Sequence, residues 1–109
     1  MNLIIRQATV TDRQSPFHNR KCDVHVQDGI IKKIADKISE KASTEIDGSG
    51  CILTPGFFDL HVNFCEPGYE YKEDLQSGCN AAMAGGFTGV LQMPGTSPVI
   101  QSKAGVEQV

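Results

Sequence analysis

The sequence predicts an α/β chain in which a β-rich first half is followed by a strand–helix–strand unit. Three observations predict it: alternating apolar and polar residues early in the chain, a change of period after residue 55, and a break in composition at residues 48–50. Residues 1–50 hold eight basic and seven acidic groups, whereas residues 51–109 hold two basic and six acidic groups. Ten of the eleven glycines lie at or after Gly48. We therefore expect one domain over residues 1–50 and a second over residues 51–109.

The first half is predicted to contain a β-hairpin. Residues 22–27 alternate apolar and polar side chains, so Val24 and Val26 share one face of a strand. Asp28-Gly29 is a two-residue signal for a type I′ turn, and residues 30–34 form the returning strand. Two further segments are strand candidates: residues 3–10 and, more weakly, residues 44–46.

Two histidines of the first half are predicted to be solvated surface residues rather than ligands. His25 lies beside Asp23 and Gln27 on the polar face of its strand. His18 lies in a loop near Pro16.

The second half begins with a predicted strand over residues 57–64, which Pro67 prevents from continuing. A helix is predicted over residues 72–84, and Gly85-Gly86 provides a left-handed stop. Its core-facing stripe is predicted from the spacing i, i+4, i+7, i+8. The stripe consists of Leu75, Cys79, Ala82 and Met83.

A second strand is predicted over residues 87–93, which completes a right-handed βαβ unit with parallel strands. Ser102 is a candidate N-cap for a further helix, with Val106 and Val109 on one face. Because that helix has only about two turns before the last residue, we expect the sequence to stop inside an element.

Composition excludes several classes of protein. A net charge of −3 gives no electrostatic footprint for nucleic acid, and the chain has no apolar run that would span a membrane. The four cysteines form no C-x-x-C pair, and we expect no secretory signal, because the first residues contain too short an apolar run. We therefore expect free thiols and a cytoplasmic protein. If one thiol does lie in a site, Cys65 is the only candidate by position; the other cysteines are Cys22, Cys51 and Cys79.

The predicted strand over residues 57–64 has an unusual polar face. In a parallel barrel alternate side chains point inward, and active sites collect at the carboxyl ends of the strands. One interpretation is therefore an active-site mouth, and the other is a polar cluster satisfied by its own hydrogen bonds. Spacing alone favours the second, because a single histidine is a weak metal signal. The face consists of Asp59, His61, Asn63 and Cys65.

Residues 55–68 read P-G-F-F-D-L-H-V-N-F-C-E-P-G and resemble the signature segment of dihydroorotases, P-G-F-I-D-x-H-V-H-F-R-E-P-G. The resemblance continues through residues 71–75, 84–88 and 93–98. The first fifty residues resemble the small β-sandwich of the amidohydrolase superfamily. The resemblance thus implies the N-terminal part of a metal-dependent amidohydrolase: a partial β-sandwich, then the first βαβ unit of an incomplete (β/α)8 (TIM) barrel, which as a whole needs roughly 250 residues.

This resemblance implies a hydrolase of pyrimidine biosynthesis. Dihydroorotases interconvert N-carbamoyl-aspartate and dihydroorotate, a cyclic amide, by means of water that zinc activates. In the family, two histidines on the first strand bind one metal ion, and a neighbouring arginine and the asparagine of M-P-N-T hold the substrate carboxylate.

The sequence departs from the family pattern at the functional positions. His61 matches the first ligand, but Asn63 replaces the second histidine, and an amide is a poorer zinc ligand than imidazole. Cys65 replaces the arginine and Gly95 the asparagine, which removes groups that would hold a carboxylate. Cys65 is also a speculative metal ligand beside His61.

Three functions stay open. The first is a dihydroorotase whose other ligands lie beyond Val109, and the second is a non-catalytic dihydroorotase-like scaffold for aspartate transcarbamoylase. The third is an amidohydrolase for another cyclic amide such as a hydantoin, against which the blocks at residues 66–68 and 71–75 argue. The departures favour loss of activity. For the 109-residue chain alone we expect no catalysis, with self-association through its open sheet.

Overall fold

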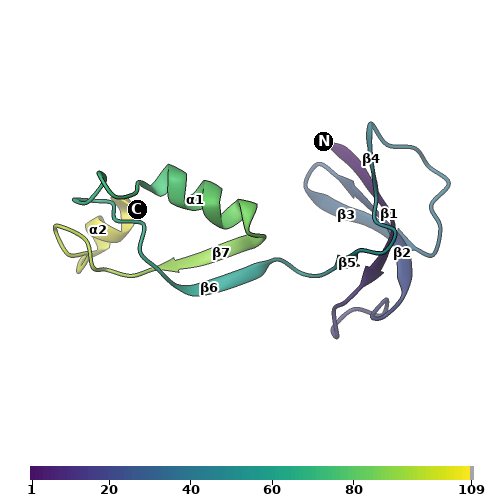
Figure 1. Cartoon of the computed structure of the whole chain (residues 1–109), viewed down its shortest axis with the longest axis horizontal. Coiled ribbons are helices and arrows are strands. Elements are labelled where there is room, and N and C mark those ends of the chain that lie inside the picture. The colour runs from purple at the N-terminus through teal and green to yellow at the C-terminus, as the bar shows by residue number, and fades with distance from the viewer. Residues whose placement is uncertain (109) are drawn as a thin grey trace. The chain divides into compact units, whose positions relative to one another are not determined.

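The computed structural model describes residues 1–108, which divide into a unit of residues 1–55 and a unit that begins at Gly56 (Figure 1). Neither helix in this part of the chain has the length or apolar character needed to cross a membrane. The elements in order are β1 (Asn2–Val10), β2 (Lys21–Gln27), β3 (Ile30–Ala35), β4 (Thr44–Asp47), β5 (Ile52–Leu53), β6 (Phe57–Val62), α1 (Leu75–Ala84), β7 (Phe87–Gln92) and α2 (Lys103–Gln108).

The first unit is a five-stranded sheet in the order β3-β2-β1-β4, with β5 also paired to β1. The β1–β2 and β2–β3 pairs are antiparallel, whereas β4 and β5 run parallel to β1. The four predicted strands of this half are confirmed. The short β5 was not predicted; because it pairs with β1, the first unit extends past residue 50 to Pro55.

The hairpin between β2 and β3 has the predicted turn. Asp28 has a φ of 52° and Gly29 a φ of 76°, so both central residues are left-handed, as a type I′ turn requires. The N–H of Asp28 also donates to the carbonyl of Met1 at 2.8 Å. The turn therefore fixes the register of three neighbouring strands.

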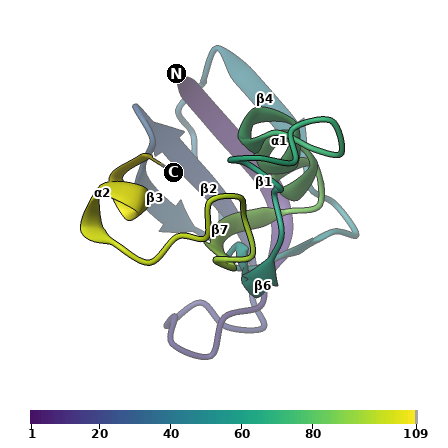
Figure 2. The same cartoon turned by 90° about the vertical axis from the view of Figure 1, so that its left-hand side faces the viewer.

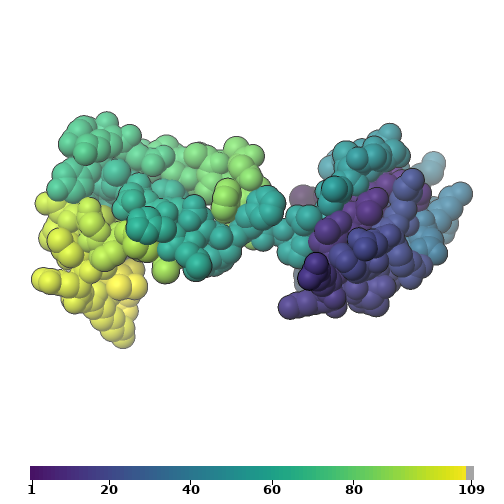
Figure 3. Space-filling view, turned by 60° about the horizontal axis from the view of Figure 1, so that its bottom comes forward, coloured from purple at the N-terminus to yellow at the C-terminus, as the bar shows by residue number. Residues whose placement is uncertain are grey.

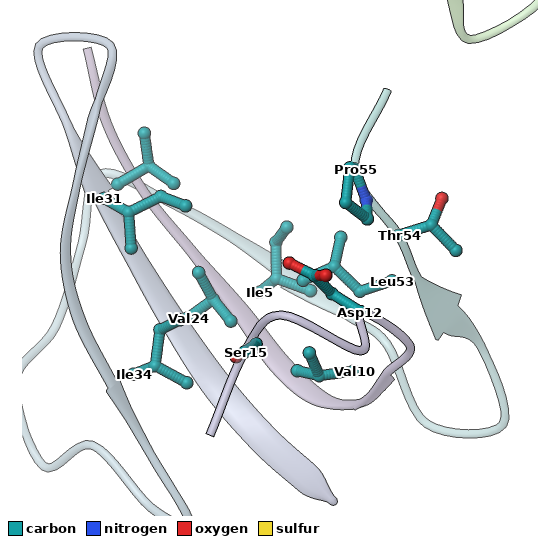
Figure 4. Close-up of a pocket in the computed structure, with 11 residues that line it drawn as sticks. Ile5, Val10, Asp12, Ser15, Val24, Ile31, Ile34, Leu53, Thr54 and Pro55 are labelled. Carbon is teal, nitrogen blue, oxygen red and sulfur yellow. The ribbon is translucent and has the colours of Figure 1, made fainter. Parts of the chain in front are cut away.

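One face of this sheet is an apolar groove (Figure 4). Ile5, Val24 and Ile34 form one row across β1, β2 and β3, because Val24 pairs with both of the others. Val26 lines the same groove as Val24, which confirms that the two valines share a face.

The opposite face is organised by a buried carboxylate, and here the prediction of a polar solvated face on β2 is wrong. Asp23 is only 2% exposed. Its Oδ1 accepts hydrogen bonds from the backbone N–H and the side-chain amide of Gln7, each at 2.9 Å, and its Oδ2 accepts the N–H of Ile38 at 2.9 Å. Gln7 reaches Asp23 because it forms a bulge in β1 with a φ of 57°.

The two histidines are less solvated than predicted. His25 is half-buried, and its Nε2 lies 2.7 Å from Oδ1 of Asn2 on the neighbouring strand. His18 is also half-buried, with a buried Nδ1 that has no hydrogen-bond partner within the described residues.

The second unit is a βαβ unit whose strands β6 and β7 are parallel, as predicted. Strand β6 ends at Val62 rather than Phe64. It ends early because Cys65 has a left-handed φ of 64° and Pro67 follows, so this segment cannot continue the ladder. Strand β7 ends at Gln92, one residue before the predicted end.

Helix α1 begins at Leu75 rather than at residue 72. The N-cap is Asp74, whose Oδ1 accepts the N–H of Ser77 at 2.7 Å, and the Ser77 hydroxyl accepts the N–H of Asp74 in return. At the other end, Gly85 is right-handed and Gly86, with a φ of 84°, supplies the left-handed stop.

The predicted core-facing stripe of α1 is only partly correct. The buried residue of the helix is Gly78, where a Cβ would lie 2.3 Å from the ring of Phe64. Leu75 and Ala82 are half-buried, but Cys79 and Met83 are exposed. Both line an apolar groove beside β7 that the second unit itself leaves open.

The apolar face of β6 is likewise open: Phe58 is 61% and Leu60 69% exposed, and the space-filling view shows this strand at the surface of its unit (Figure 3). At the end of the chain, Ser102 Oγ accepts the N–H of Gly105 at 3.2 Å, which supports the predicted N-cap of α2. Val106 is exposed, and Val109 lies outside the described residues.

Candidate functional site

The loops that follow β6 and β7 lie at one end of the second unit, because the two strands are parallel (Figure 1). Figure 2 looks onto this end. The N–H of Met93 donates to the carbonyl of Val62 at 2.9 Å, and the N–H of Ser97 donates to the carbonyl of Pro67 at 2.9 Å. These bonds join the two loops, so the candidate residues from both strands share one end of the sheet.

Asp59 and His61 are the two candidate residues that lie within β6. Asp59 is half-buried, and its Oδ1 accepts the backbone N–H of His61 at 2.9 Å. The His61 side chain is exposed. The carboxylate is therefore engaged by the backbone next to the imidazole.

Asn63 and Cys65 lie after the strand, so the predicted row of four polar side chains on one strand face is wrong beyond His61. Asn63 is exposed, whereas Cys65 is half-buried and its thiol lies 3.6 Å from the carbonyl of Asn63. The N–H of Tyr69 donates to the carbonyl of Cys65 at 2.8 Å. Backbone geometry therefore sets the direction of the Cys65 side chain.

Gly95 lies in the loop after β7, where an added Cβ would meet no atom within 4 Å. The neighbouring Thr96 is 5% exposed, and its hydroxyl donates to the carbonyl of Pro98 at 2.8 Å. The loop thus has a fixed backbone and open space where the family pattern has an asparagine side chain.

The sequence reasoning missed the residues that connect these loops. The Oε2 of Glu66 accepts the N–H of Leu75 at 2.8 Å, and the carbonyl of Glu66 accepts the side-chain amide of Gln92 at 2.9 Å. One signal in the sequence could have indicated the first bond: Glu66 is a carboxylate beside a proline turn, nine residues before the first residue of the helix, where negative charge is favoured.

Charged groups around the site are held within the loop after β6. The N–H of Gly68 donates to Glu70 at 2.8 Å and lowers the pKa of that carboxyl below its ordinary value. The ammonium of Lys72 lies 5.2 Å from the ring centre of Tyr69 and 5.6 Å from that of Tyr71. The one cation of this loop therefore contacts aromatic rings.

The donor set does not form a zinc site by itself. Zinc sites in proteins use imidazole, thiolate and carboxylate ligands in groups of three or four. Within residues 1–108, no three side chains of histidine, cysteine, aspartate or glutamate gather in this way. His61 supplies one imidazole, and the side chain at residue 63 is an amide. These residues alone therefore do not supply the three or four ligands that a zinc ion takes.

A parallel βαβ unit with candidate side chains at the carboxyl ends of its strands is typical of α/β proteins, in barrels as in open sheets. The pattern of the family described as "Amidohydrolase family" matches residues 52–108, which is more than half of the chain. The chain belongs to the amidohydrolase family.

The chain is also similar to curated dihydroorotases. It is 43% identical to that of Pelobacter propionicus over 105 residues, which cover 95% of this chain and 24% of the relative. It is 48% identical to that of Streptococcus pneumoniae over 98 residues, which cover 90% of this chain and 23% of the relative. The chain thus spans about a quarter of the length of the curated relatives it matches.

Among solved structures, the L-hydantoinase (dihydropyrimidinase) of Arthrobacter aurescens matches with a TM-score of 0.85 at 23% identity, over 98% of this chain and 24% of that one. The D-hydantoinase of a Thermus species matches with a TM-score of 0.64 at 25% identity, over 84% of this chain and 20% of that one. These similarities confirm the predicted fold class.

Proposed function

We propose that the protein to which this chain belongs is a dihydroorotase-like amidohydrolase that has lost ordinary zinc-dependent hydrolysis of dihydroorotate. The similarity to dihydroorotases over most of the chain supports the first part. The observation that carries the second part is the set of side chains at the carboxyl ends of β6 and β7. Of the four positions that the family motif uses, His61 alone keeps its side chain; the other three hold Asn63, Cys65 and Gly95.

Loss of metal binding follows from the donor chemistry at the end of β6. His61 and Asn63 would present one imidazole and one neutral amide, and an amide replaces imidazole poorly as a zinc ligand. The carboxylate of Asp59 already accepts the N–H of His61. A zinc ion would therefore depend on ligands from the rest of the protein.

Loss of substrate binding follows from charge. Dihydroorotate and N-carbamoyl-aspartate are carboxylates, and the family pairs the carboxylate with arginine and asparagine side chains. Cys65 offers a thiol in place of a guanidinium, and Gly95 offers no side chain. Loss of one charged hydrogen-bonding partner in a site costs about 2–5 kcal/mol.

A non-catalytic protein that keeps this scaffold would act through association, and we propose a scaffold role beside aspartate transcarbamoylase for the whole protein. For the 109-residue chain alone we propose self-association. The large apolar side chains of the βαβ unit support it: Phe57, Phe58, Leu60 and Leu91 are each at least half exposed. A monomeric mass at high concentration in sedimentation experiments would contradict this self-association.

The test of lost activity uses the complete protein that contains this sequence. Bound zinc is measured by mass spectrometry of the metal, and hydrolysis of dihydroorotate is followed by absorbance. We expect substoichiometric zinc and no turnover. One zinc ion or more per chain, together with turnover of the order shown by the Streptococcus pneumoniae relative in the same assay, would overturn the proposal.

A restored variant sharpens this test. Asn63→His, Cys65→Arg and Gly95→Asn are introduced together, and an added Cβ at residue 95 would meet no atom within 4 Å. Recovered zinc binding would support descent from an active site. The matched control adds His61→Ala to the restored variant and is expected to lose the zinc again.

A further inference from the structure

We infer that Glu66 is a positioning residue of the candidate site, because it joins the end of β6 to the start of α1 and to the end of β7, and so holds Cys65 and Gly95 in place. The inference rests on the proposed location of the site at these strand ends. It does not depend on whether the protein hydrolyses dihydroorotate.

The first link is made by the carboxylate of Glu66. Its Oε2 accepts the N–H of Leu75, the first residue of α1, at 2.8 Å in a partly buried contact. The first N–H groups of a helix have no partner within the helix, and negative charge is favoured there. Asp74 takes the N–H of Ser77 in the same turn. The N–H groups of the first helical turn are therefore bound by two carboxylates, and that of Glu66 belongs to the loop after β6.

The second link is made by the backbone of Glu66. Its carbonyl accepts the side-chain amide of Gln92, the last residue of β7, at 2.9 Å. Three residues further along the chain is Gly95. The N–H of Ser97 also donates to the carbonyl of Pro67 at 2.9 Å, and this bond joins the same two loops. The loop that carries Gly95 is thus bonded on both sides of that glycine to the Glu66-Pro67 segment.

Cys65 is the residue that these links constrain most directly. It is a non-glycine residue with a φ of 64°, a conformation that persists where the surroundings determine it. Two contacts hold this conformation. The carbonyl of Cys65 accepts the N–H of Tyr69 at 2.8 Å, and the next residue, Glu66, is bonded to the N–H of Leu75. Without the Glu66 carboxylate, one of the two anchors of this conformation is gone. We therefore expect the half-buried Cys65 thiol to become more accessible.

The reactivity of that thiol tests the inference in the full chain without any assay of activity. The rate at which iodoacetamide alkylates Cys65 is measured by peptide mass spectrometry in the wild type, Glu66→Ala and Glu66→Gln. We expect a roughly tenfold faster reaction in Glu66→Ala, because a hydrogen bond to a charged group is lost. Glu66→Gln should return most of the wild-type rate, since its amide oxygen accepts the same N–H.

Two comparisons separate positioning from general stability. Hydrogen exchange of the β7 amides at residues 87–92 reports opening of the whole unit and should stay unchanged in Glu66→Ala. Glu70→Ala is the matched control, because Glu70 accepts the N–H of Gly68 in the same loop. Its Cys65 rate should stay near that of the wild type.

Two results would overturn the inference: an unchanged Cys65 rate in Glu66→Ala, or β7 exchange that accelerates by the same factor as alkylation. If the alanine variant does not fold, Gln92→Leu removes the second link alone. It should then raise the Cys65 rate, and failure to do so would also count against the inference. Zinc content and turnover enter none of these readouts.

Discussion

Arg6 and Asp23 form an ion pair in which Nη1 of the arginine lies 3.1 Å from Oδ2 of the aspartate, whose side chain is almost fully buried. A second nitrogen of the same guanidinium lies 2.7 Å from Oε1 of Glu45. The arginine therefore connects strands β1, β2 and β4 through two carboxylates. Because Asp23 also binds the bulge in β1 and the N–H of Ile38, this pair is the centre of the first unit.

Asp23→Asn should destabilise the first unit by about 2–4 kcal/mol, because it leaves Arg6 and two backbone donors without their charged partner. Opening of the unit can be followed by the reaction of the buried Cys22 thiol with a thiol reagent in increasing urea. Asp36→Asn is the matched control. That carboxylate lies 2.6 Å from Arg20 but is 72% exposed, so its replacement should change the urea midpoint of unfolding little. Equal shifts in the two variants would contradict the central role of Asp23.

The same carboxylate predicts how stability depends on pH. Burial alone would raise the pKa of Asp23, but hydrogen bonds from Ile38, Gln7 and Arg6 outweigh it and lower the pKa from 3.8 to about 2. A depressed pKa in the folded state stabilises the fold above the ordinary pKa, and this contribution is lost as the pH falls from about 4 toward 2. It amounts to about 2 kcal/mol.

Urea midpoints of the first unit, measured by circular dichroism from pH 7 to pH 2, check this dependence. The wild type should lose stability below about pH 4, and Asp23→Asn should lose less over the same range. If the two curves are parallel, another acid is responsible. Glu45 is the first alternative, because the Arg6 hydrogen bond lowers its pKa as well.

Much of the fold could be predicted because local patterns determine it. The Asp28-Gly29 turn and the parallel βαβ order each follow from a few neighbouring residues. Asp23 could not be placed by the same reasoning. Alternation put it on a polar face, but its burial depends on donors from Gln7 and Ile38, which are 16 and 15 residues away. A long-range network of this kind leaves no periodic signal.

The candidate site was predictable in its location but not in its geometry. The motif placed His61 and Cys65 at the end of a strand. Strand periodicity then predicted that both side chains lie on one face. That prediction is wrong because the backbone of Cys65 is left-handed, so the alternation of a β-strand does not extend to this residue. The Glu66–Leu75 bond was likewise invisible, since it depends on where α1 begins.

Asp74→Ala should loosen the start of α1. The N–H and hydroxyl of Ser77 lower the pKa of Asp74, so the capping carboxylate is charged at neutral pH. Without it, the first-turn amides at residues 75–77 should exchange hydrogen roughly fivefold faster. Glu73→Ala, which removes the adjacent carboxylate but leaves the capping box, serves as the control. Equal acceleration in the two variants would point to the loss of negative charge rather than of the cap.

Gly68→Ala should separate the two loops of the candidate site, which follow β6 and β7. Gly68 has a φ of 101°, and an added Cβ would lie 2.1 Å from the carbonyl oxygen of Ser97, so both conformation and space exclude alanine. We expect the free energy of unfolding of the second unit to fall by about 2 kcal/mol or more. Unfolding in urea is monitored by the fluorescence of Tyr69 and Tyr71. Gly95→Ala is the control in the partner loop, since a Cβ there meets nothing within 4 Å and φ is not left-handed. It should leave the midpoint nearly unchanged. If Gly68→Ala is tolerated equally well, the two loops are not packed against each other as the Ser97–Pro67 bond indicates.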